Sequence, residues 1–227
     1  MVARNPREGS SRLLVLGAGP AQLGLLEAAR ARGIWTAVAD RNPAAPGFPL
    51  ADRLAYSYFV TYGLPIVVVR PFNNYGPRQH PEKVVPRFVT QALRGEPLTI
   101  HGDGHATRDW LYVEDDAEAI RAAIEAPLED VAGEVVNVAT GVDISVAEIA
   151  AMVLDAVGAP QSRCVFVEER PGQVDRHIGS TEKAARLLGW RSRTGFADGL
   201  DRTVAWYREN EAWWRGILAR EARAFSS

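Results

Sequence analysis

Four consecutive β-branched residues, Ile66-Val67-Val68-Val69, constrain the fold more than any other part of this 227-residue chain. Successive side chains of a strand project to opposite faces of a sheet, so an unbroken apolar run must be covered on both faces. Sheets covered on both faces are mostly parallel and have helices above and below them. The run therefore predicts an interior strand of an α/β domain.

The segment before this strand has the pattern strand, glycine turn, helix, strand. Leu13–Leu16 is a short apolar run, a helical pattern extends to Gly33, and Trp35–Ala39 is a second β-rich run. These are the parts of one βαβ unit with parallel strands. With Val135–Ala139 as a fourth strand, we expect a reduced Rossmann-like parallel sheet with helices on both faces. We expect the first strand to lie between the second and the third.

The turn of this βαβ unit contains Gly17, Gly19 and Gly24, and Asp40 follows its second strand. The spacing resembles a dinucleotide fingerprint, in which glycines let a pyrophosphate approach a helix N-terminus and the acid binds a ribose hydroxyl. Position 22, a glycine in the fingerprint, is Gln here. The segment is also similar to the N-terminal unit of ATP-grasp ligases of the biotin carboxylase type, where it is largely a scaffold. The pattern is thus compatible with a nucleotide contact and with a scaffold.

Two dense motifs follow the buried strand: RPFNNYGPRQHPEK (residues 70–83) and GDGHATRDWLYVEDDAEAI (residues 102–120). Together with TYGLP, RGEPLTIHGDG, GEVVNVATG, ERPGQVDRH, LLGW and TVAWY, they occur in the order of the extended short-chain dehydrogenase/reductase family. From Thr61 to about Trp213 the chain resembles this family, in particular its dTDP-glucose 4,6-dehydratases and nucleotide-sugar epimerases. The resemblance implies a Rossmann-like sheet with a small α/β substrate-binding subdomain, NAD as cofactor, a nucleoside-diphosphate sugar as ligand, and a homodimer.

The resemblance also implies individual ligand contacts. Arg108 matches an arginine that pairs with the diphosphate, as a planar guanidinium can. Asn73 lies on the nicotinamide side and Asn74 on the diphosphate side; dehydratases tend to carry Pro and Tyr in place of Thr99 and His101, which leaves the preferred base open. The implied substrate contacts are Asn74, Lys83, Val84, Thr99, His101, Arg108, Asn137 and Arg170, and the implied cofactor contacts are Gly17, Gly19, Gly24, Asp40 and Asn73.

Two of these assignments have a purely structural alternative. The sequence Asn-Asn-Tyr-Gly-Pro is also typical of a simple turn, because each of its residue types favours one. Arg108 has Asp109 and Asp115 nearby in the sequence as alternative ion-pair partners. The flanking motifs favour the ligand interpretation in both cases.

The residues that perform chemistry in this family are not visible in the chain. There, a Tyr acts as the base, and a Lys on the next helical turn lowers its pKa. Counting back from Asn73 by the family spacing, the Tyr falls near Ala44 and the Lys near Phe48, and neither Tyr56 nor Tyr58 has a Lys four residues later. The acid pair of dehydratases is also missing. We therefore leave the catalytic residues unassigned.

Two functions follow from these observations. The first is a protein that binds a nucleoside-diphosphate sugar without turning it over, because the Tyr-Lys pair is missing. The alternative is an active NAD-dependent nucleotide-sugar 4,6-dehydratase or 4-epimerase that uses a different base.

Composition narrows the remaining possibilities. The net charge of −2 argues against binding to nucleic acid or an anionic membrane. Apolar runs are shorter than the about 18 residues that suggest a membrane span. The single cysteine, Cys164, excludes an internal disulfide. The four His residues lack the spacing of metal ligands. We expect a cytoplasmic protein with a disordered tail (1–12), a βαβ nucleotide-binding-like unit (13–53) and an epimerase/dehydratase-like region (54–227).

Overall fold

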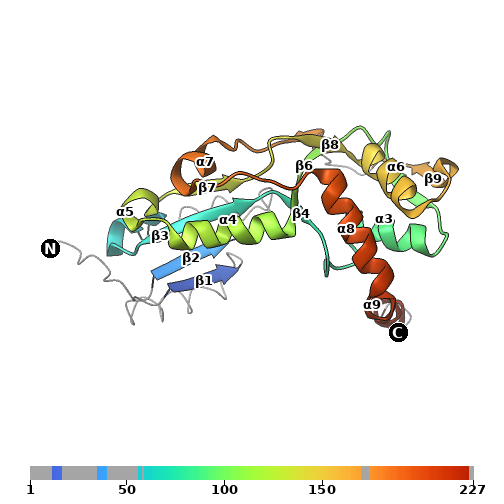
Figure 1. Ribbon diagram of the computed structural model, residues 1–227, viewed down its shortest axis with the longest axis horizontal. Coiled ribbons are helices and arrows are strands. Elements are labelled where there is room, and N and C mark those ends of the chain that lie inside the picture. Colours follow the sequence, from blue (N-terminus) through green and yellow to red (C-terminus); the bar gives the residue numbers. More distant parts are fainter. Residues whose placement is uncertain (1–11, 17–34, 40–55, 58, 170–173, 225–227) are drawn as a thin grey trace. The chain divides into compact units, whose positions relative to one another are not determined.

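The computed structural model describes residues 12–16, 35–39, 56–57, 59–169 and 174–224 (Figure 1). The chain divides into two compact units, each made of three segments. Unit 1 comprises Met1–Asn73, Asp115–Gly141 and Gly179–Ser192, and unit 2 comprises Asn74–Glu114, Val142–Ile178 and Arg193–Ser227. The predicted tail and the predicted helix after the first strand lie outside the described residues.

Unit 1 contains a four-stranded parallel sheet in the order β1-β2-β3-β7 (Figure 1). The strands are β1 (Arg12–Leu16), β2 (Trp35–Ala39), β3 (Ile66–Pro71) and β7 (Val135–Val138), at the positions that the apolar runs predict. The expected order was wrong, because β2 and not β1 lies next to β3, with Val38 opposite Val68. Each strand up to β3 pairs with the one before it, which is the usual arrangement of consecutive strands.

The interior position predicted for β3 is confirmed. Ile66, Val67, Val68 and Val69 are all at most 8% exposed, although they project to both faces of the sheet. Of the helices of unit 1, α4 (Val113–Glu125) buries Ala119 and Ala123, α5 (Leu128–Val131) precedes β7, and α7 (Glu182–Leu188) contacts β7. The fold is thus Rossmann-like, as the sequence predicts.

Unit 2 is a mixed α/β unit with two small sheets. Strand β6 (Thr107–Tyr112) pairs with β10 (Arg176–His177) in parallel, with β8 (Asp143–Ser145) in antiparallel orientation, and with β4 (Asn73–Tyr75). Strand β5 (Leu98–His101) pairs in parallel with β9 (Cys164–Val167). The helical elements are α3 (Val84–Leu93), α6 (Val146–Val157), the short 3-10 helix η2 (Gln161–Arg163), α8 (Phe196–Glu209) and α9 (Glu211–Ala224).

Large aromatic residues form much of the core of unit 2. The rings of Tyr75 and Tyr112 lie 5.6 Å apart, and Tyr75 also packs on Phe196 at 4.7 Å. Trp214 of α9 is fully buried and donates its indole N–H to the carbonyl of Tyr207 at 2.8 Å. Helix α9 therefore contributes to the core of unit 2 through Trp214.

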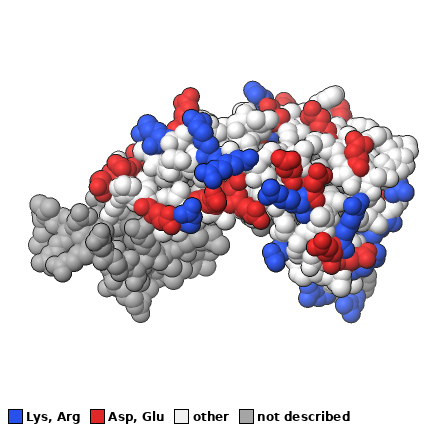
Figure 2. All heavy atoms as spheres, in the orientation of Figure 1, with Lys and Arg blue, Asp and Glu red and all other residues white. Residues whose placement is uncertain are grey.

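The surface of both units carries charges of both signs. Figure 2 shows Lys and Arg side chains interspersed with Asp and Glu side chains on the face that is drawn. Within the described part of the chain, every helix is too short or too polar to cross a bilayer.

Helix α8 provides a test of the aromatic core. A methyl group at Gly199 would lie 2.8 Å from the Tyr112 ring and 2.9 Å from Tyr75 Cζ, and both rings are buried. Overpacking outweighs the better helix propensity of Ala, so we expect Gly199→Ala to lower the free energy of unfolding by about 1–2 kcal/mol. Urea unfolding followed by circular dichroism measures this change.

Gly216 of α9 is the matched control, because a methyl group there meets nothing within 4 Å. Gly216→Ala should raise the free energy of unfolding by up to about 1 kcal/mol through helix propensity alone. Equal effects of the two substitutions would contradict the packing described around Gly199.

Candidate functional site

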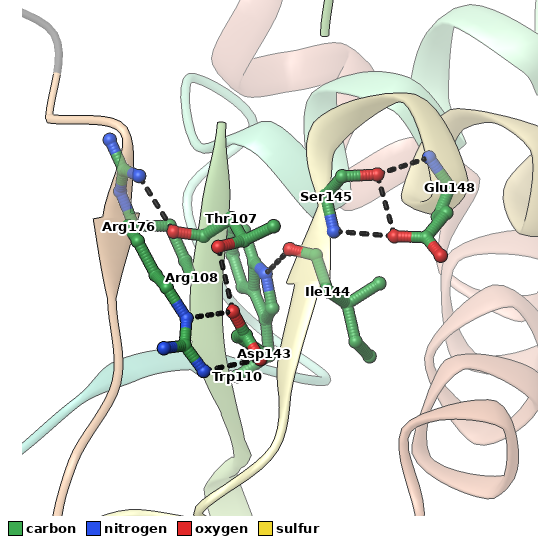
Figure 3. A network of polar contacts seen from close by, with 8 residues as sticks. All are labelled: Thr107, Arg108, Trp110, Asp143, Ile144, Ser145, Glu148 and Arg176. Atoms are coloured by element: carbon green, nitrogen blue, oxygen red, sulfur yellow. Dashed lines mark hydrogen bonds and ion pairs between the residues drawn. The ribbon is translucent and has the colours of Figure 1, made fainter. Parts of the chain in front are cut away.

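The three-stranded arrangement β8-β6-β10 carries Arg108, the central residue of the predicted substrate site (Figure 3). Arg108 lies on β6, opposite Ile144 of β8 and opposite His177 of β10. Three segments that are distant in the sequence thus meet beside this arginine.

A polar network fixes β8 and β10 against β6 (Figure 3). Arg176 donates from Nε to Asp143 Oδ2 at 2.7 Å, and Thr107 donates from Oγ1 to the same oxygen at 2.8 Å. The hydrogen bond from Arg176, followed by that from Thr107, lowers the pKa of Asp143 from 3.8 to about 2. The carboxylate of Asp143 therefore stays ionised and joins all three strands.

Arg108 is half-buried and retains hydrogen-bonding capacity. Its Nη1 donates to the carbonyl of Thr107 at 2.7 Å. Burial lowers the pKa of Arg108, and the negative charge of Asp175 opposes this shift. A guanidinium has five N–H donors, and the Thr107 carbonyl accepts from one of them. The arrangement is suited to an anion with several acceptor oxygens.

The loop after β4 is held by contacts that the sequence does not reveal. Gln79 donates from Nε2 to the carbonyl of Asn74 at 2.6 Å, and its own carbonyl accepts a hydrogen bond from the Tyr207 hydroxyl of α8. Gly76 has a φ of 148°, and a Cβ there would lie 2.5 Å from Val113 Cγ1. These contacts give the backbone around Asn74 a defined path. Gln79 lies within the motif of residues 70–83, but its spacing from Asn74 and Tyr207 gives no sign of these contacts.

The end of this loop leads into α3, where two further predicted residues lie. Lys83 occupies the N-cap position of α3, and its Nζ is 2.9 Å from Glu82 Oε1. Val84 is the first residue of the helix and is half-buried.

The predicted base-side residues share one face of β5. Leu98 and Ile100 are buried in the core of unit 2, whereas Thr99 and His101 alternate with them and are half-buried. His101 Nδ1 lies 3.1 Å from the carbonyl oxygen of Glu168, and Arg87 Nη2 donates to the carbonyl of Thr99 at 3.4 Å. The strand period thus brings Thr99 and His101 together on the side opposite the core.

A capping box lies at the start of α6. Ser145 Oγ accepts from the backbone N–H of Glu148 at 3.2 Å, and the Ser145 N–H donates to Glu148 Oε2 at 2.8 Å. The hydrogen bond from the Ser145 side chain is the largest cause of the lowered pKa of Glu148. Because Ser145 also ends β8, the cap anchors the strand that carries Asp143.

The remaining predicted residues belong to unit 1 or lie outside the described residues. Asn137 of β7 pairs with Arg70 of β3 near the carboxyl ends of these strands, where open α/β sheets bind ligands, and Asn73 follows β3. Gly17, Gly19, Gly24, Asp40 and Arg170 are outside the described residues. Among the described residues, no group of three or more His, Cys, Asp and Glu side chains is arranged to hold a metal ion.

Comparison with protein families gives a match over most of the chain. The family described as GDP-mannose 4,6 dehydratase matches residues 36–203. A dTDP-glucose 4,6-dehydratase of Actinoplanes sp. is 43% identical over 188 residues, which are 80% of this chain and 57% of the relative. The low-salt glycan biosynthesis protein Agl12 of Haloferax volcanii is 40% identical over 170 residues, which are 75% of this chain and 54% of the relative. The chain thus spans little more than half the length of these relatives.

Solved structures show the same fold. The dTDP-glucose 4,6-dehydratase of Bacillus anthracis in complex with NAD has a TM-score of 0.82 at 28% identity, covering 91% of this chain and 75% of that one. The double mutant of DesIV, a dTDP-glucose 4,6-dehydratase from Streptomyces venezuelae with NAD and DAU bound, has a TM-score of 0.81 at 30% identity, covering 92% and 76%.

The Asp143 network predicts a specific pH dependence of stability. A carboxylate whose pKa is lowered on folding stabilises the protein above its ordinary pKa of 3.8, and this contribution is lost as the pH falls to about 2. We therefore expect Asp143→Asn to be less stable than the parent at neutral pH, and the difference to shrink as the pH falls through this range. Urea unfolding at a series of pH values measures it.

Glu211→Gln is the control for this series, because it removes a carboxylate from the exposed ion pair of Glu211 with Arg215 on α9. Exposed pairs of this kind contribute little to stability. A pH dependence of Asp143→Asn no larger than that of Glu211→Gln would contradict the role assigned to Asp143.

Proposed function

Because the chain belongs to the GDP-mannose 4,6 dehydratase family, we propose that it binds a nucleoside-diphosphate sugar and does not convert the sugar by itself. The observation that carries the binding part is Arg108, a half-buried guanidinium at the meeting point of β6, β8 and β10. A diphosphate carries two negative charges and several acceptor oxygens, which match the N–H donors of an arginine.

Further residues are proposed to contact the other parts of the nucleoside-diphosphate sugar. Asn74 and Lys83 belong to the loop that Gln79 and Tyr207 hold in place, so we propose that they contact the diphosphate and the sugar. Thr99 and His101 present one face of β5, which we propose contacts the base. Val84, Asn137 and Arg170 complete the proposed substrate contacts by their positions in the family motifs.

The tyrosines and lysines of the sequence support the proposed lack of independent turnover. Its lysines are Lys83 and Lys183, and the residues four positions earlier are Gln79 and Gly179, so no Tyr-x-x-x-Lys pair exists. Tyr207 does not replace the missing base, because burial raises its pKa and its hydroxyl donates to the Gln79 carbonyl. A general base needs a pKa near the working pH, the opposite of this shift.

We further propose that NAD is the cofactor of the nucleotide-binding-like unit. The parallel pairing of β1 with β2 is that of a βαβ unit, and in dinucleotide-binding folds such a unit carries the turn that meets the pyrophosphate. Gly17, Gly19, Gly24, Asp40 and Asn73 are the residues that would hold the cofactor, and two solved structures similar to this chain contain bound NAD. When bound, NAD supplies a hydride acceptor.

An active NAD-dependent 4,6-dehydratase or 4-epimerase that uses another base is the second candidate. It is favoured by the 43% identity to a dTDP-glucose 4,6-dehydratase across the region that carries Arg108 and the Asn73–Asn74 loop. The homodimer, the cytoplasmic location and the division into segments 1–12, 13–53 and 54–227 stay predictions.

Calorimetric titration with dTDP-glucose and with NAD, followed by an assay for the absorbance of a 4-keto product, separates the two candidates. Sugar-nucleotide binding without product supports the proposed function. Clear turnover would replace it by the enzyme, and absence of sugar-nucleotide binding would refute both.

Arg108→Ala tests the central contact. Loss of a charge-assisted hydrogen bond to the diphosphate should weaken dTDP-glucose binding by about 1.5–3 kcal/mol, which calorimetry detects directly. Arg121→Ala is the matched control, since Arg121 is an exposed arginine of α4 paired with Glu125. Equal affinities of the Arg108→Ala and Arg121→Ala variants would remove Arg108 from the site.

A further inference from the structure

Strand β10 places His177 beside the proposed diphosphate contact. In the parallel pairing of β10 with β6, His177 is opposite Arg108 and Arg176 is opposite Thr107. Paired residues of neighbouring strands project to the same face, and the next residue projects to the other. Arg176 and Thr107 both bind Asp143 on one face, so Arg108 and His177 share the opposite face.

Charged side chains surround His177, so an anion that binds beside it would change the pKa of its imidazole. Arg108 of β6 shares the face of His177, and the charge of Asp109 of β6 also acts on it. Asp175 and Arg176 precede His177 in the chain, and Arg176 is bound to Asp143. Burial is the largest cause of the lowered pKa of His177, the positive charge of Arg108 adds to it, and Asp109 opposes it. Burial and the charge of Arg108 thus both favour the uncharged imidazole.

We infer that His177 is a second, titratable contact of the diphosphate, acting with Arg108 and making the binding of a nucleoside-diphosphate sugar stronger at lower pH. This inference rests on the proposed function. The protonation of His177 would then depend on the ligand, because a bound diphosphate compensates the charge of Arg108 and brings negative charge next to the imidazole. An opposite charge within a few ångströms favours the protonated form of histidine.

Proton uptake on binding is the direct consequence. If the diphosphate raises the pKa of His177 by about one unit, the affinity for the ligand rises about tenfold once the imidazole is fully protonated. The pyrophosphate of a nucleotide sugar is esterified at both ends, so the ligand itself does not titrate in this range.

The experiment is calorimetric titration of the full chain with dTDP-glucose between about pH 8 and about pH 6, where histidine changes charge. Each titration is repeated in two buffers that differ in ionisation enthalpy, which measures the protons taken up. For the parent chain we expect the affinity to rise toward the lower pH by up to about sixfold, with net proton uptake.

Three variants assign the effect to one side chain. His177→Gln keeps a polar side chain that does not titrate, and should bind with the weaker affinity at both pH values and without this proton uptake. His177→Lys carries a permanent charge and should bind with the stronger affinity at both. His105→Gln removes an exposed histidine of the same unit and should behave like the parent chain.

The outcomes separate this inference from the proposed function. Binding with no pH dependence in the parent chain, or a pH dependence that persists in His177→Gln, overturns the role of His177 while the proposed function stands. Absence of binding by the parent chain at every pH overturns both. Absence of net proton uptake by the parent chain also overturns the role of His177, and this outcome needs no variant, so a substitution that unfolds the protein does not remove the test.

Discussion

Burial of β3 on both faces is the constraint on which the rest of unit 1 depends. A strand with apolar side chains on both sides satisfies its backbone only through neighbouring strands, and β2 and β7 supply these partners. The apolar run ends at Arg70, and the chain then enters the polar loop that begins with Asn73 and Asn74. The same strand thus forms the sheet and delivers polar residues to its carboxyl end.

In unit 2, the alternation of side chains along β6 and β10 places the residues that join the strands on one face and the proposed ligand contacts on the other. Asp143 binds Thr107 and Arg176 and so joins β6, β8 and β10. One residue further along β6 and β10, Arg108 and His177 occupy the other face. The ion pair on one face therefore positions the strands that carry Arg108 and His177 on the other, which links the stability of the unit to its proposed ligand.

The family motifs favour binding of a nucleotide sugar, whereas the missing Tyr-Lys pair argues against its turnover. The motifs coincide with the elements that hold Arg108 and the Asn74 loop, and these are intact. Tyr207 is a buried hydrogen-bond donor to that loop and so holds the loop in place. The proposed function, ligand binding without turnover, combines the intact motifs with the missing Tyr-Lys pair.

The sequence by itself determined the features that depend on neighbouring residues. The buried strand at Ile66–Val69, the alternation of Thr99 and His101 on β5, and the Ser145–Glu148 cap all follow from side-chain periodicity or short spacing. The tertiary structure alone decided which distant segments meet. Strand β2 lies beside β3 in place of the expected β1, Arg176 reaches Asp143 across 33 positions, and Tyr207 reaches Gln79 across 128. Such partners are selected by packing of the whole unit, because periodicity specifies the face of an element and leaves its neighbour unspecified.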